Sequence, residues 1–108
     1  MTTKSKSYTI RTDQGDWLGQ VVLTSDGMFA AVTDFGNLSY IWRSTGEKDF
    51  REFIAGLGTG YFGSKLQNGL SYIAYSNKTL KGCNLFAEKI LPPLQKMLKE
   101  EISNNIDW

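Results

Sequence analysis

The chain of 108 residues contains no histidine. This absence excludes catalysis by an imidazole acid or base, Ser–His and Cys–His nucleophilic pairs, and metal sites with histidine ligands. Cys83 is the only cysteine, which excludes an internal disulfide and a zinc site built from several thiolates, and which suits a reducing compartment. Lys81 or a helix N-terminus could activate Cys83 as a nucleophile. We favour its ordinary role, a small buried or half-buried thiol at the start of the last helix.

Long apolar segments are also absent. No stretch approaches the roughly 18 apolar residues needed to span a bilayer, and residues 1–7 carry two lysines with no apolar run after them. We therefore expect neither secretion nor membrane insertion. The 12 Lys and Arg residues nearly balance the 11 Asp and Glu residues, so the net charge does not direct the protein to nucleic acid or to an anionic membrane.

The first part of the sequence predicts an antiparallel β-meander. Short runs rich in β-branched and aromatic residues alternate with glycine-containing turns at hairpin spacing. The pair Asp26-Gly27 is a strong turn signal of this kind. We expect strands at 8–12, 17–24, 28–33 and 38–43.

Beyond Arg43 the apolar residues recur with a helical period. Ser44 or Thr45 could cap a short helix that stops at the glycines of 56–58, and Glu47, three residues after Ser44, fits a capping box. A second short helix is expected from Thr59, with Gly69 beyond its end. Their apolar positions are Phe50, Phe53, Ile54 and Leu57 in the first helix, and Phe62 and Leu66 in the second.

The last helix is expected over 80–102, with an apolar stripe that keeps its phase across Pro92 and Pro93. One helix with a kink near 88–93 fits this stripe better than two helices. Packed with the short helices on one face of the meander, it predicts an α+β fold. Residues 70–75 fit a short strand or an aromatic loop equally well. The single domain is expected over 8–102, between flexible tails at 1–7 and 103–108, and Trp108 has no evident place in the core.

The carboxylates and the glycine-rich segment predict neither a catalytic site nor a phosphate-binding site. The segment from Gly58 to Gly63 has the spacing of a phosphate-binding loop, but Ser64 and Lys65 come in the wrong order and the segment follows a helix. We therefore expect no enzyme activity, no catalytic residues, no cofactor and no metal site. Four aspartates lie at turn positions, where this residue normally caps the backbone: Asp13, Asp16, Asp26 and Asp34.

Three stretches carry a family resemblance: VVLTSDGMFA (21–30) with DFGN (34–37) and YIW (40–42); DFREF (49–53); and SYIAY (71–75) with FAEKILP (86–92). Over residues 17–98 the chain resembles small hypothetical proteins from the accessory gene regions of bacteriophages and prophages. The resemblance implies that the protein is encoded by a phage or prophage, and it assigns no functional residues. Such genes frequently encode proteins that bind and block host defence machinery, anti-CRISPR proteins among them.

The leading hypothesis is a phage-encoded, non-enzymatic protein that binds a host protein complex in the bacterial cytoplasm and inhibits or modulates it. Aromatic residues and arginine dominate binding energy at protein interfaces. At least one of Trp17, Tyr40 and Trp42 should instead be buried between sheet and helices. The candidate partner-binding residues are Trp17, Tyr40, Trp42, Arg43, Tyr72 and Tyr75.

The alternative is a small nucleic-acid-binding protein. Residues 59–99 hold six lysines and one acid, a local charge of +5, whereas 1–58 sum to −1 and 100–108 to −3. Two tyrosines just before the middle of this segment could stack on bases while lysines meet phosphates. The segment contains no arginine for bidentate contacts, which weakens the hypothesis. The candidate lysines are Lys65, Lys78, Lys81, Lys89, Lys96 and Lys99.

A homodimer is a further hypothesis. A kink at the two prolines would turn the second half of the last helix away from the sheet and leave an apolar strip exposed. Such a strip suits an isologous dimer, which needs only one self-complementary patch. Its residues would be Leu94, Met97, Leu98 and Ile102.

Overall fold

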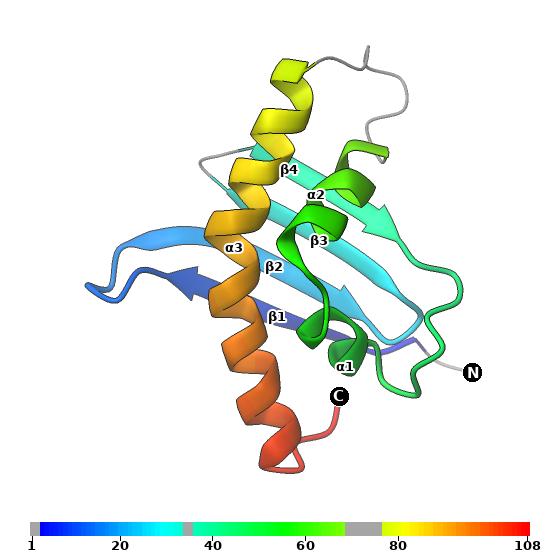
Figure 1. Ribbon diagram of the computed structural model, residues 1–108. Helices are drawn as coiled ribbons and strands as arrows, with labels where there is room; N and C mark the ends of the chain where they lie inside the picture. The colour runs from blue at the N-terminus through cyan, green and yellow to red at the C-terminus, as the bar shows by residue number, and fades with distance from the viewer. Residues whose placement is uncertain (1–2, 34–35, 69–76) are drawn as a thin grey trace.

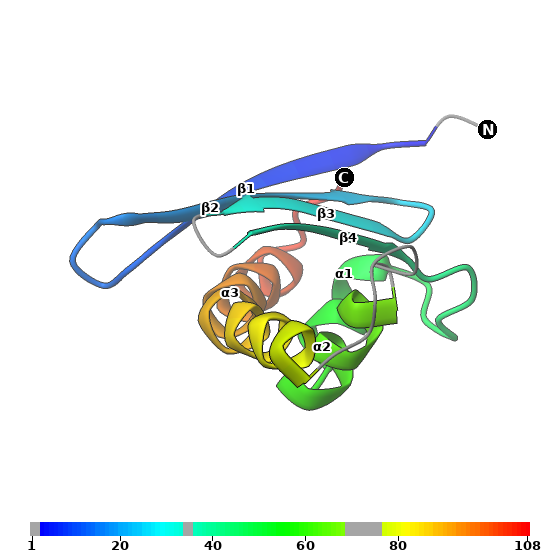
Figure 2. The ribbon, with the colours of Figure 1, turned by 90° about the horizontal axis from the view of Figure 1, so that it is seen from above.

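Four strands form an antiparallel sheet in sequence order, β1-β2-β3-β4. The computed structural model describes residues 3–33, 36–68 and 77–108. Three helices follow the strands and all lie on one face of the sheet (Figures 1 and 2). The predicted α+β fold, a four-stranded meander followed by helices, is confirmed. The strands are β1 (Ser5–Arg11), β2 (Trp17–Thr24), β3 (Met28–Thr33) and β4 (Gly36–Ile41).

The hairpin between β2 and β3 turns where the Asp-Gly pair predicts. Gly27 has a φ of +102°, a conformation that side chains with a Cβ rarely adopt. Its amide donates to the carbonyl of Thr24 at 3.2 Å, and its carbonyl accepts the amide of Trp42 at 2.9 Å. The turn therefore also holds the residue that follows β4.

β1 begins three residues earlier than predicted. The backbone of Lys4 and the side chain and backbone of Ser25 exchange hydrogen bonds of 2.8 and 2.9 Å, which extend the pairing of β1 with β2. The prediction of a flexible tail over 1–7 is therefore wrong for residues 5–7. The sequence pattern missed them because Ser5, Lys6 and Ser7 have low strand propensity and are held by cross-strand pairing.

The first helix, α1 (Phe50–Ala55), is capped by Asp49, whose side chain accepts the amide of Arg51 at 2.9 Å. The predicted cap at Ser44 or Thr45 is wrong. Thr45 instead closes a local turn, accepting the amide of Glu47 at 3.2 Å. The second helix, α2 (Thr59–Asn68), starts at the predicted residue.

The last helix, α3 (Asn77–Ser103), is one helix with Pro92 and Pro93 inside it, as predicted (Figure 1). Pro92 and Pro93 have no amide to donate to the carbonyls of Glu88 and Lys89, and both of these residues are exposed. The apolar stripe is buried on both sides of the prolines. In the predicted dimer strip, Leu94 and Leu98 are completely buried and Met97 packs against the core.

The predicted dimer contact is therefore wrong: Leu94, Met97, Leu98 and Ile102 do not form an exposed strip. Ile102 is half-buried like Met97. α3 packs against α1, α2, β1 and β2, and its second half is part of this packing. Phe86 and Ile90 continue the same buried face before the prolines.

Replacing Gly27 with alanine tests the coupling between this turn and Trp42. A Cβ at Gly27 would lie 2.2 Å from the carbonyl oxygen of Trp42, in addition to the strain of the positive φ. We expect Gly27→Ala to lower the free energy of unfolding by about 2–4 kcal/mol. The control is Gly15→Ala, because Gly15 has a φ of +91° but no atom within 4 Å of the added Cβ; it should cost about 1 kcal/mol. Urea denaturation measures both, and equal losses would contradict the steric contact.

Candidate functional site

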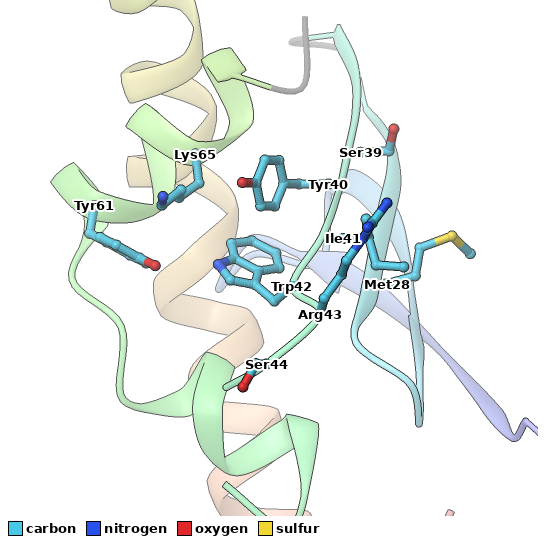
Figure 3. A pocket seen from close by; sticks show the side chains of 9 residues that line it. All are labelled: Met28, Ser39, Tyr40, Ile41, Trp42, Arg43, Ser44, Tyr61 and Lys65. Carbon is cyan, nitrogen blue, oxygen red and sulfur yellow. The ribbon is translucent and has the colours of Figure 1, made fainter. Parts of the chain in front are cut away.

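A groove beside β4 brings together part of the predicted partner-binding set. Residues 39–44 and Met28 line it from the sheet, and Tyr61 and Lys65 line it from α2 (Figure 3). Its volume is about 740 Å³, within the range of small-ligand and side-chain pockets. Tyr40, Trp42 and Arg43, all predicted to contact a partner, take part in it.

The remaining predicted contacts lie elsewhere. Trp17 is exposed at the start of β2, away from the lining of the groove. Tyr72 and Tyr75 fall outside the residues that the structure describes. Of the predicted aromatic residues, Trp42 is the buried one, with 6% of its surface exposed.

Trp42 belongs to the core and to the groove at once. Its ring stacks on Phe62 with an interplanar angle of 5° and a centroid distance of 6.0 Å, and Tyr40 meets it edge-on at 4.6 Å. Its indole nitrogen Nε1 is buried and has no hydrogen-bond partner in the part of the chain that the structure describes. In Figure 3 this nitrogen points to the same space as the Lys65 ammonium and the Tyr61 hydroxyl.

The groove carries positive charge only. Lys65 lies with its ammonium 5.5 Å from the centre of the Tyr61 ring, a cation–π contact that holds it at the groove wall. Arg43 is exposed on the other side of the strand, where Figure 3 shows it beside Ile41. No Asp or Glu is among the described residues that line it. The groove therefore presents cationic and neutral donors to whatever fills it.

The sheet face opposite the helices is bare (Figure 2). Alternation along the strands places Met28, Val32 and Ile41 on it, and these are 40%, 57% and 46% exposed. Met28 and Ile41 are direct cross-strand partners and also line the groove. The groove and the apolar outer face are thus continuous around β4.

The six candidate lysines do not form one surface. Lys65 lies in the groove, and the side chain of Lys78 falls outside the described residues. Spacings of eight, seven and three residues put the other four along one exposed side of α3. The exposed acids Glu88 and Glu100 lie beside them and reduce the local positive charge. These four lysines are Lys81, Lys89, Lys96 and Lys99.

Among residues 3–33, 36–68 and 77–108, no three His, Cys, Asp or Glu side chains come together to hold a metal ion. Cys83 is buried, and burial raises the pKa of its thiol. Asp13, Asp16 and Asp26 are exposed at turns, and Asp34 lies outside the described residues. No helix in the described structure has the length and apolar character required to cross a membrane.

A family model described as a phage family, Phage_phiTE_072, matches residues 1–84. The chain belongs to this phage family. The resemblance to phage proteins is therefore confirmed, and the match does not confirm an anti-defence role. No curated protein and no solved structure matches the chain. All groove residues lie inside the segment that the phage family model covers.

The phage family protein also contains a buried charge cluster that no sequence pattern indicated. Arg51 is 4% exposed; its guanidinium donates to Asp49 Oδ2 at 2.7 Å, to Glu101 Oε1 at 2.7 Å and to the carbonyl of Ile106 at 2.7 Å. The Tyr8 hydroxyl donates to the same Glu101 oxygen at 2.9 Å. The cluster joins β1, α1, α3 and the C-terminal residues.

Each charge in this cluster is compensated. Burial would raise the pKa of Asp49 and of Glu101, but the hydrogen bonds from Arg51 outweigh it and hold both pKa values below their usual range. The bond to Asp49 and the bond to Glu101 raise the pKa of Arg51. Burial, followed by its bond to Glu101, raises the pKa of Tyr8. Strongly shifted groups often mark active sites, but here they are fully paired, which is the arrangement of a structural cluster.

The C-terminal residues close this cluster, which corrects their prediction as a flexible tail. The Arg51 guanidinium lies 5.2 Å from the centre of the Trp108 ring, and Trp108 packs against the core. The only available signal was an aromatic residue in a polar segment. Its partner lies more than 50 residues away in the sequence, so no local pattern could identify it.

Replacing Arg51 with methionine should be strongly destabilising. The apolar side chain would leave Asp49 partly buried without a counter-ion and Glu101 with only Lys6, whose ammonium lies 3.5 Å from Glu101 Oε2. We expect a loss of about 2–3 kcal/mol in the free energy of unfolding because both carboxylates keep some contact with water. The matched control, Arg43→Met, changes an exposed arginine and should stay within about 0.5 kcal/mol. Urea denaturation compares them; equal effects would contradict a structural role for the cluster.

The same cluster predicts acid sensitivity. Because the folded pKa values of Asp49 and Glu101 are lowered, their contribution is complete above the unfolded values of about 4 and is lost as the pH falls from there through the folded values. Urea denaturation at pH 7, 5, 4 and 3 should show a steep loss of stability below about pH 4. The double variant Asp49→Asn/Glu101→Gln should be less stable at pH 7 and show a flatter profile. Parallel profiles would argue against this origin.

Proposed function

We propose that this phage family protein is a non-enzymatic binding protein that acts on a host protein complex in the bacterial cytoplasm, as an inhibitor of the anti-defence type. The observation that carries the proposal is the continuous surface around β4, where the groove meets the bare apolar sheet face. Membership of a phage family supports the setting.

The composition of this surface supports protein binding. Single exposed apolar side chains are ordinary, but Met28 and Ile41 are adjacent across two strands, with Val32 on the same face of β3, and grouped apolar residues mark interaction sites. Tyr61 and Arg43 at its rim are residue types that anchor protein interfaces. An apolar centre with such a rim is the usual composition of a protein interface.

The second candidate function is nucleic-acid binding through the four exposed lysines of α3. Their alignment along one side of the helix favours it. The interspersed Glu88 and Glu100 and the lack of an exposed aromatic residue between them weaken it, because binding to single strands combines cationic grooves with stacking rings.

A capture experiment with matched variants tests the proposal. The tagged full chain is incubated with host lysate as wild type, as Ile41→Glu and as Leu85→Glu. Ile41 and Leu85 are 46% and 45% exposed, one on the outer sheet face and one on α3. Wild type and Leu85→Glu should capture the same host protein, and Ile41→Glu should lose at least tenfold in affinity.

Two outcomes would overturn the proposal. One is the absence of any captured protein together with a salt-dependent shift of DNA or RNA that Lys96→Gln/Lys99→Gln abolishes, since each neutralised phosphate releases counterions. The other is a loss of capture in Leu85→Glu that Ile41→Glu does not show, which would place the interface on α3 and not on the surface around β4.

A further inference from the structure

The unpaired indole of Trp42 indicates what fills the groove. An indole N–H is a donor only, and buried donors in native structures nearly always have an acceptor. Trp42 is 6% exposed, its Nε1 has no partner among the described residues, and the nitrogen faces the groove. An occupant must therefore supply an acceptor at this point.

The neighbouring side chains specify a charged acceptor. The Lys65 ammonium lies at the same wall, and the lining contains no carboxylate that could neutralise it. The tyrosine hydroxyls of Tyr40 and Tyr61 can donate as well. Donors without a competing acid favour an oxyanion, since hydrogen bonds to ionised acceptors are the stronger ones.

The edge of the sheet specifies the form of the occupant. Within the described part of the chain, β4 has a neighbouring strand on one side only. The Trp42 amide donates to the carbonyl of Gly27, so these two residues form a hydrogen-bonded pair. Hydrogen-bonded positions alternate along a strand of an antiparallel ladder. The backbone groups of Ser39 and Ile41 therefore point away from β3, toward the open edge. Such an edge binds an extended peptide as an added strand.

We propose that the groove beside β4 binds an extended acidic peptide segment of the partner protein, which adds to β4 and places a carboxylate between Trp42 Nε1 and Lys65. This inference rests on the proposed function. Side chains of an added strand alternate between the two faces. The acidic residue therefore points into the groove, while its neighbours lie on the outer face, against Met28 and Ile41, and are apolar.

A nucleic-acid phosphate has the same charge but fits less well. A phosphate backbone cannot satisfy the amides and carbonyls of a strand edge with the spacing of a peptide. Lys65 is also separate from the lysines aligned on α3, so the groove does not continue into a basic track. Nucleic-acid binding is therefore one of the outcomes that the experiment below distinguishes.

Selection from a random library of twelve-residue peptides, displayed on their own messenger RNA, tests the proposal on the full chain. We expect selected peptides to share Asp or Glu at one fixed position, flanked on both sides by apolar residues. Replacing that acid with its amide, or Lys65 with Gln, should weaken binding about tenfold or more. The matched control Lys96→Gln, an exposed lysine on α3, should leave binding unchanged.

The indole proton of Trp42 supplies a direct readout. In ¹H–¹⁵N spectra the indole resonance absent from Trp42→Phe should shift with the acidic peptide and not with its amide version. The proposal is overturned if no peptide is selected, if the selected peptides lack a fixed acid, if Lys96→Gln weakens binding as much as Lys65→Gln, or if oligothymidylate shifts the resonance and the peptide does not. If one of these results is obtained while the full chain still captures a host protein, the proposed function stands and only the binding of an acidic peptide segment is refuted.

Discussion

The structure depends on one buried guanidinium. Arg51 is held by Asp49 at the N-cap of its own helix, by Glu101 near the end of α3, and by a carbonyl of the C-terminal segment. Removing three charged groups from water costs free energy, and only complete pairing offsets that cost. The position of α1 relative to β1 and α3 is therefore tightly restricted. Because α1 follows the 42–49 connection, the cluster also restricts where the groove beside β4 can form.

Trp42 joins this framework to the candidate site. Its ring packs among Phe50, Phe53 and Phe62, so it is as much a core residue as any in the sheet. Its carbonyl lies against Gly27, at a distance that no other residue type would allow. A side chain held so firmly cannot turn its indole nitrogen toward an internal acceptor. The indole nitrogen, which has no partner among the described residues, is thus held in a fixed position at the groove.

The two faces of the sheet differ in what covers them. Helices α1, α2 and α3 pack on one face, and the large buried side chains lie between them and the strands. The other face carries apolar side chains without a covering layer. This open face is continuous with the β4 edge, and that continuity supports the proposal of a peptide partner.

The sequence by itself determined the elements, because their signals are local. Alternating apolar residues, the Asp26-Gly27 turn and the helical stripe across Pro92 and Pro93 each depend on neighbours a few residues apart. Tertiary structure decided everything that depends on distant partners. It paired Ser5 and Lys6 into β1, tied Trp108 to Arg51, buried Leu94 and Leu98, and brought Lys65 to Trp42. Burial and charge compensation are properties of groups that meet only after folding, so no local pattern could assign them.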